Sequence, residues 1–258
     1  MTFLHLHGFV PPFTPDGPNA PDHLRVDLGG LVALATVASA PREDGDAAIE
    51  DTLALGAVHH ALLCASIEAG DVLPVRPGAM FSGEDALRQA LVRRVPGYLK
   101  HLERLSGQVE FAVHCCRNPA LNGSAGAVAE SASAAPPASE RQKAMAPSGR
   151  AFLATRRNQR AARRSRAGDR RSFVAGLVND LHSFAEAQSP LATADQGVLA
   201  HVAFLVMRTN TEGFLAALER LAPSGEALGL DLSVMGPLPP YAFAGHAQES
   251  QKREAAHV

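Results

Sequence analysis

Several residue types are scarce in this chain, and each scarcity excludes a class of protein. The 258 residues include no Trp, two Tyr and three Cys. An odd number of cysteines, with Cys115 and Cys116 adjacent and Cys64 far from both, does not suit a disulfide framework. We therefore expect a reducing, cytoplasmic compartment and not a secreted disulfide scaffold.

Long apolar runs and a strong net charge are also missing. No stretch approaches about 18 uninterrupted apolar residues, so we expect no transmembrane helix and no membrane partner. The first residues lack the basic and apolar regions of a secretion signal, so we expect none. A net charge of −2 gives no overall reason to expect nucleic acid as a partner. With 46% hydrophobic and 19% charged residues, the composition is that of a globular protein with one large or two small domains.

The first part of the chain mixes strand and helix patterns. Apolar residues alternate along 3–10 until two prolines stop the run. Between 87 and 105 large apolar residues recur every three or four positions, which predicts one helix face, and Pro96 should kink or split that helix near Val95. The elements expected here are strands at 3–10 and 31–35, a helix over 46–69, an extended segment at 72–78 and a helix over 87–105.

The composition changes sharply after Cys116. Residues 118–148 are nearly all Ala, Ser, Gly and Pro, with almost nothing large to bury, which predicts a flexible linker or loop. The elements expected around it are strands at 109–115, 202–207 and 228–234 and helices over 150–187 and 211–221. One further short strand near Leu191 would complete a ferredoxin-like β-α-β-β-α-β sheet.

These patterns predict an α+β fold with two domains. We expect an N-terminal α+β domain at 1–107 and a C-terminal ferredoxin-like domain, a modified βαββαβ unit, at 108–245. The second domain would contain a flexible Ala/Ser/Pro-rich insertion at 118–148, and a flexible tail would follow at 246–258.

Six segments carry a resemblance to a known family. Two have rare cores: VLPVRPGAMF at 72–81, and GPLPPYAF at 236–243, where three prolines remove backbone donors. The others are FLHLHG at 3–8, LGGLVAL at 28–34, LSGQVEF at 105–111 and GRAFLATR at 149–156. In this order the six segments resemble the gas vesicle protein GvpL/GvpF family. The chain departs from the family pattern at Pro77, Ala79, Leu238 and Ala242.

The resemblance implies an accessory structural protein of gas vesicle assembly, with two α+β domains and no known catalytic activity. Members act with the small, very hydrophobic shell protein of the vesicle. The implied partners are therefore that shell protein and other gas vesicle accessory proteins. The implied role is an assembly factor in gas vesicle organization and buoyancy, located at the gas vesicle and in the cytoplasm.

The residues themselves predict no catalytic, cofactor or metal site. The pair at 59–60 and the run at 114–116 contain possible metal ligands, but neighbours in a helix or strand point in different directions. His5 and His7 share one strand face, yet no C-x-x-C or H-x-x-x-H spacing occurs. The glycines at 29–30 lack the spacing of a phosphate loop, and no nucleophile, base and acid occur together. We expect no metal ion, no cofactor and no catalysis.

Two charges and two aromatic side chains are predicted to have structural roles. Glu110 and Arg76 lie beside apolar neighbours in extended segments, where an unpaired charge is unfavourable. We predict a buried or interdomain salt bridge, with each other or with other charges, and a partner contact is the open alternative. Tyr241 and Phe243, two residues apart on an extended C-terminal arm, should point the same way and pack against the first domain or the domain junction.

One segment is strongly basic. Eight arginines occur within the 16 residues of 156–171. Arg156, Arg160 and Arg163 are spaced to form one helical stripe, which predicts a solvated face that contacts an acidic surface on another vesicle protein. The alternative is a cytoplasmic nucleic-acid-binding protein that uses this Arg-rich helix. Interleaved aromatic residues are absent from the segment, so we favour the first interpretation and expect no nucleic acid.

Overall fold

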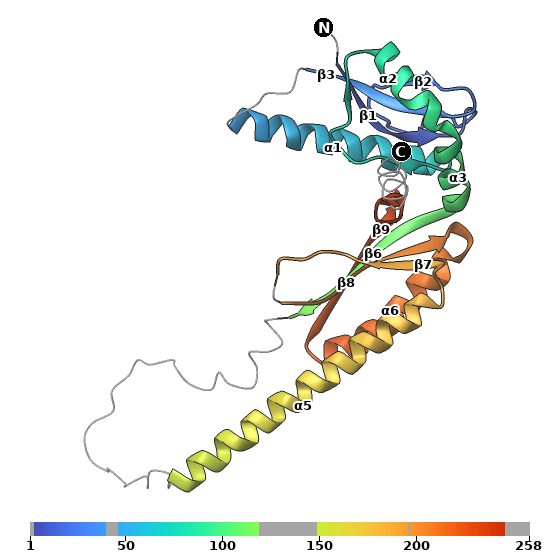
Figure 1. Ribbon diagram of the computed structural model, residues 1–258. Helices are drawn as coiled ribbons and strands as arrows, with labels where there is room; N and C mark the ends of the chain where they lie inside the picture. Colours follow the sequence, from blue (N-terminus) through green and yellow to red (C-terminus); the bar gives the residue numbers. More distant parts are fainter. Residues whose placement is uncertain (1–2, 40–45, 119–148, 196, 246–258) are drawn as a thin grey trace, which may run out of the picture.

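The structure is a computed structural model that describes residues 3–39, 46–118, 149–195 and 197–245. The flexible insertion predicted at 118–148, apart from Asn118, lies outside the described residues, as does the flexible tail predicted at 246–258. Two antiparallel sheets, each with its own helices, lie one above the other in Figure 1. The predicted α+β fold class is confirmed. The domain boundary at residue 107 stays a prediction.

The first sheet is built around β1, whose two faces are covered by different helices. Its strands are β1 (Phe3–Val10), β2 (Leu24–Asp27), β3 (Val32–Ala38), β4 (Leu73–Pro74) and β5 (Met80–Phe81). The strand order is β2-β3-β1-β4, and β5 also pairs with β1. Leu4 and Leu6 pack toward α2 (Glu84–Leu91) and α3 (Val95–Leu105). His5 and His7 alternate with them and are buried on the face covered by α1 (Asp46–Ala69).

The helix predicted over 87–105 is split where Pro96 predicts it. A 3-10 turn, η1 (Val92–Arg94), follows α2, and α3 then begins with Pro96 in its first turn. Proline suits this position because the first turn of a helix leaves its backbone N–H groups unpaired anyway. The apolar stripe of this segment is buried against the first sheet: Leu87, Leu91, Val95, Tyr98 and Leu102.

The second sheet has the predicted β-α-β-β-α-β element order. Its elements are β6 (Gln108–Arg117), α5 (Gly149–His182), β7 (Ala187–Pro190), β8 (Val198–Met207), η3 (Arg208–Asn210), α6 (Thr211–Ala227) and β9 (Leu230–Leu238). The strand order is β7-β8-β6-β9 with antiparallel neighbours throughout. The short strand expected near Leu191 is β7. On β6, Val109, Phe111 and Val113 alternate toward α5 and α6, where Leu177 and Phe214 are buried with them.

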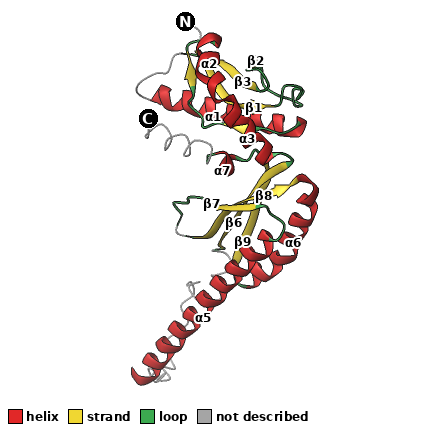
Figure 2. Cartoon of the chain, turned by 45° about the vertical axis from the view of Figure 1, so that its right-hand side comes forward, coloured by secondary structure: helices red, strands yellow, loops and turns green. Residues whose placement is uncertain are grey.

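The two sheets are joined through buried apolar contacts and through the end of the chain. Ala203 and Leu205 of β8 belong to the same buried cluster as Leu4 and Leu6 of β1. After β9 the chain turns back as the short helix α7 (Tyr241–Ala244), which lies between the two sheets in Figure 2. The Arg208 guanidinium donates hydrogen bonds to the carbonyls of Ile67 and Gly70 at the end of α1, at 2.7 and 3.0 Å.

The long helix α5 is packed only along its second half. Side chains from Phe173 onward pack toward α6, and Leu177 and Leu181 are buried. From 153 to 166 every side chain is exposed. Figures 1 and 2 show this part of α5 extending well beyond the second sheet.

Among the described helices, one has the length and apolar composition of a membrane span. It is the Ile49–Ala69 portion of α1. The expectation of no transmembrane helix was based on uninterrupted apolar runs. This helix contains polar residues but still has a high mean hydropathy. Core helices of soluble folds can have the same mean hydropathy. Within this span Leu62 and Leu63 are fully buried, and 33% of the apolar window is buried overall.

Candidate functional site

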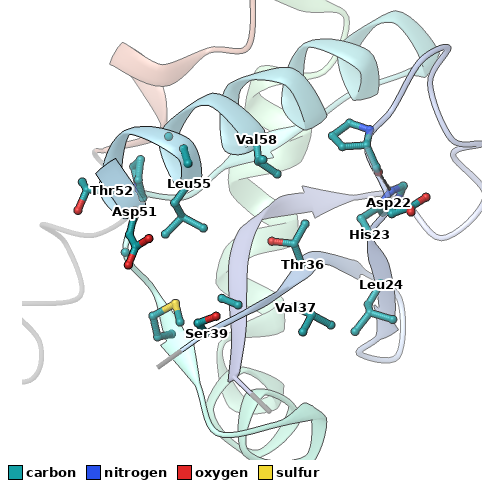
Figure 3. Close-up of a pocket in the computed structure, with 17 residues that line it drawn as sticks. Asp22, His23, Leu24, Thr36, Val37, Ser39, Asp51, Thr52, Leu55 and Val58 are labelled. Carbon is teal, nitrogen blue, oxygen red and sulfur yellow. Dashed lines mark hydrogen bonds between the residues drawn. The ribbon is translucent and has the colours of Figure 1, made fainter. Parts of the chain in front are cut away.

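An apolar groove opens between the first half of α1 and the strands of the first sheet. Its volume is about 830 Å³. Figure 3 shows Leu55 and Val58 on the α1 wall, facing the strands that carry Leu24 and Val37. Apolar side chains from three parts of the chain thus meet around one hollow, which is the usual make-up of a binding site.

The strand wall of the groove includes an open sheet edge. β2 pairs with β3 only from Val32 to Ala35, whereas β1 pairs with β3 as far as Ala38. Among the described strands, none pairs with 36–38 on the side that β2 leaves open. Unpaired backbone groups of this kind can accept an extended segment of another protein as an added strand.

Exposed apolar side chains also occur on the first half of α1, outside the groove, and on β3. On the same half of α1, Ile49 is 60% and Leu53 is 68% exposed, and Val37 on β3 is 65% exposed. Ile49 and Leu53 are four residues apart in α1 and share one helix face, and exposed apolar side chains grouped in this way commonly mark an interaction surface. The groove therefore offers apolar side chains to a partner, together with backbone groups of β3 that no other described strand pairs with.

Three buried histidines lie directly behind the groove. Nδ1 of His7 is 3.1 Å from Nδ1 of His59, and Nε2 of His7 is 2.8 Å from the hydroxyl of Thr36. The Gly78 N–H donates to Nε2 of His5 at 2.8 Å. Thr36 and Gly78 also line the groove, so the histidines are one residue away from it.

The histidine cluster stays neutral at physiological pH. Burial, with a smaller contribution from neighbouring histidines, lowers the pKa of His7 to about 3 and that of His59 to about 4. Burial also lowers the pKa of His5. The sequence showed that His5 and His7 share a strand face, but only the packing of α1 on β1 brings His59 to them. Reasoning from sequence missed this convergence.

The structure separates Glu110 from Arg76. Glu110 is 3% exposed, and its carboxylate accepts a hydrogen bond from the Ala242 N–H at 2.8 Å. Arg76 is exposed, and among the described residues no ion pair joins the two. The prediction that they pair with each other is wrong because β4 ends at Pro74, so Arg76 lies in the turn beyond the sheet.

Tyr241 and Phe243 both contact the first half of the protein, but from different sides of α7. The Tyr241 hydroxyl is 3.1 Å from Nδ1 of His60, and its ring stacks near His59. Phe243 is 3% exposed and lies in the cluster of Leu4 and Leu6. The arm was expected to be extended with both rings on one side. That expectation is wrong because 241–244 are helical, and residues two apart in a helix face nearly opposite directions.

Arg156, Arg160 and Arg163 lie together on one side of α5. They border a shallow hollow of about 240 Å³, and their side chains are exposed. Arg170, from the same basic segment, instead donates from Nε to the Leu228 carbonyl at 2.7 Å. The segment therefore combines an exposed basic stripe with at least one arginine that ties α5 to the end of α6.

Comparisons with known proteins agree on one family. The family described as gas vesicle synthesis protein GvpL/GvpF matches residues 24–245. Gas vesicle protein F from Streptomyces sp. (strain CB03234) is 30% identical over 236 residues, covering 86% of this chain and 88% of that protein. Gas vesicle protein L from the same strain is 29% identical over 201 residues, covering 74% of this chain and 69% of that protein.

Two solved structures share the fold. The crystal structure of the gas vesicle protein GvpF from Anabaena sp. PCC7120 superposes with a TM-score of 0.65 at 14% identity, over 95% of this chain and 96% of that one. The crystal structure of GvpF from Microcystis aeruginosa gives a TM-score of 0.61 at 16% identity, over 94% of this chain and 98% of that one. At these identities the likeness supports the fold alone.

Proposed function

Because this chain belongs to the GvpL/GvpF family of gas vesicle synthesis proteins, we propose that it assists gas vesicle formation by binding the hydrophobic shell subunit before or during polymerisation. The protein is associated with gas vesicle assembly through its family. Binding of the shell subunit, action in the cytoplasm, and an accessory role without catalysis are the parts that we add.

The groove beside the open edge of β3 carries this proposal. A free subunit of a very hydrophobic shell would aggregate through its exposed apolar surface and unpaired backbone groups. The groove offers apolar walls from α1 and from the strands, together with unpaired backbone at 36–38. A segment held there would have its apolar side chains and one strand edge covered until it joins the growing shell.

The basic stripe of α5 supports a second contact. Arg156, Arg160 and Arg163 face the same hollow, on the part of α5 that extends beyond the second sheet. We propose that they bind an acidic surface of another gas vesicle accessory protein. Contacts of this kind weaken as salt screens the charges, whereas apolar capture in the groove does not.

Co-purification of the full chain with the shell subunit tests the proposal. Leu55→Asp places a charge on the helix wall of the groove, and Val37→Asp places one on the strand side. Leu153→Asp is the matched control, because Leu153 is 66% exposed on α5, away from the groove. We expect wild type and Leu153→Asp to retain the shell subunit at high salt and the two groove variants to lose it.

Three results would contradict the proposal. One is a purified protein that does not associate with the shell subunit at any salt concentration. Another is equal retention by both groove variants and the control. The third is a deletion strain that still makes normal floating vesicles. Binding to generic duplex DNA that falls steeply with salt would favour the nucleic-acid alternative for the Arg-rich helix.

A further inference from the structure

Three histidine rings converge in a buried space between β1 and α1. His5 and His7 are 0% and His59 is 3% exposed. One nitrogen from each ring can be chosen so that all three lie within 4.8 Å of one another. The ring centroids are 4.4 Å apart for His5 and His7 and 5.2 Å apart for His7 and His59. The rings are thus close enough for one ion to contact all three after small movements.

Two of the nitrogens already have the separation that one metal ion requires. Two nitrogens bound to one tetrahedral Zn²⁺, at about 2.0–2.1 Å each, lie roughly 3.3 Å apart. The Nδ1 atoms of His7 and His59 are 3.1 Å apart and face each other across a single shared proton. An ion between them would take the place of that proton.

A neighbouring hydroxyl can hold His7 in the tautomer that a metal needs. When Nε2 of His7 donates to the Thr36 hydroxyl, at 2.8 Å, the lone pair of Nδ1 is left free. Metal-binding histidines almost always fix their second nitrogen in this way, through an acceptor outside the ligand set. Thr36 is therefore placed to act as a positioning residue.

Two other ring nitrogens are buried with no hydrogen-bond partner among the described residues. They are Nδ1 of His5 and Nε2 of His59. Buried polar atoms are nearly always paired, so the orphan Nδ1 of His5, close to the facing nitrogens of His7 and His59, points to a missing ligand. Nε2 of His59 would take up the proton that leaves its Nδ1 when an ion binds there. For His5 to bind through Nδ1, its proton must move to Nε2, and the bond from the Gly78 N–H must be given up. Gly78 is exposed in a turn, where such a movement is possible.

We propose that His5, His7 and His59 form a binding site for a transition-metal ion of the Zn²⁺ type. Three neutral imidazoles suit Zn²⁺, Co²⁺, Ni²⁺ or Cu²⁺, whereas Mg²⁺ and Ca²⁺ require oxygen ligands. Thr36 and Gly78, which contact the histidines, also line the groove, and this gives the ion a route inward. The site is independent of shell binding, so either proposal can fail alone.

Metal titration of the full-length protein tests the site. The metal-free protein is titrated with Co²⁺, whose visible absorption reports tetrahedral nitrogen coordination, and then with Zn²⁺ as a competitor. We expect one Co²⁺ per chain, displaced by Zn²⁺, and a rise in melting temperature with Zn²⁺. His59→Gln should weaken binding at least about tenfold, and Thr36→Val, which keeps all three ligands, should weaken it by about 10–100-fold.

His60→Gln is the matched control, because His60 adjoins His59 on α1 but is exposed and bonds Tyr241 instead. Its binding should equal that of wild type. Circular dichroism of each variant shows whether it is folded, and Thr36→Val keeps the test valid if a histidine variant does not fold. The proposal is overturned if wild type binds no stoichiometric Co²⁺, or if His59→Gln and Thr36→Val bind as tightly as wild type. It is also overturned if His60→Gln loses binding to the same extent.

Discussion

Replacing Glu110 by Gln should change how the stability of this protein depends on pH. The Glu110 carboxyl is 3% exposed between the second sheet and α7. Loss of hydration raises its pKa from 4.5 to about 7, against the opposing effect of the hydrogen bond from the Ala242 N–H. Gln has nearly the same shape and retains an oxygen that can accept this bond, so the substitution removes the titration and little else.

The sign follows from the raised pKa. Glu110 holds its proton more tightly in the folded protein than in the unfolded chain, so its contribution to stability is fully present below pH 4.5. As pH rises to about 7 that contribution is lost. Each pH unit between the two pKa values corresponds to about 1.4 kcal/mol, so the total is about 3 kcal/mol. Above pH 7 wild type must bury a charged carboxylate, and the Gln variant need not.

Urea denaturation of both proteins over this pH range measures the effect. Relative to Glu110→Gln, the free energy of unfolding of wild type should fall by about 3 kcal/mol between pH 4.5 and pH values above 7. Histidine titration is common to both proteins and cancels in the difference. The nearby Tyr241 stays neutral because burial raises its pKa. Glu219→Gln, at an exposed position on α6, should show no such trend.

A difference between wild type and Glu110→Gln that stays constant with pH would refute this reasoning. It would mean that the carboxylate keeps most of its hydration in the folded protein. A trend of equal size in Glu219→Gln would refute it as well, because the effect would then be a general response to removing a negative charge.

Two further predictions concern α7 and α5. Phe243→Ala should lower the free energy of unfolding, measured by urea denaturation, by about 3–5 kcal/mol, because the ring is buried in the first-sheet core. The control Phe13→Ala should change it little, because the Phe13 side chain is 97% exposed. Replacing Arg156, Arg160 and Arg163 together by Gln should leave the melting temperature unchanged and should reduce vesicle yield only in part. A complete loss of vesicles would show that the groove is not the main contact.

The sequence predicted the elements whose patterns are local. The alternation in β6 and the stripe of α2 and α3 follow directly from which side chains must be buried. The βαββαβ order of the second sheet followed from the succession of these patterns, once a short strand was added for β7. The family resemblance also rested on short segments of the sequence and is confirmed by the comparisons.

Features that depend on how distant elements meet could not be predicted. The groove exists because β2 begins at Leu24, opposite Ala35, while β3 continues to Ala38 without a partner from β2. No local pattern in the sequence specifies that register. His59 reaches His5 only because of the angle at which α1 crosses β1. Arg76 was expected beside the sheet because its apolar neighbours suggested an extended segment. The strand β4 ends at Pro74, so Arg76 lies beyond it. In α7, Pro240 accepts backbone bonds from Phe243 and Ala244, which turns an expected extended arm into a helix.

The length of α5 sets how far apart the two proposed contacts of this protein would be. Its 34 residues rise about 50 Å at 1.5 Å per residue, and only the second half is fixed to the second sheet. The basic stripe therefore lies on the part of α5 that extends beyond the second sheet, whereas the groove lies beside the first sheet. If both proposed contacts form, one chain would hold a shell subunit and a second protein at separate places. The protein would then be a spacer between successive components of a growing structure.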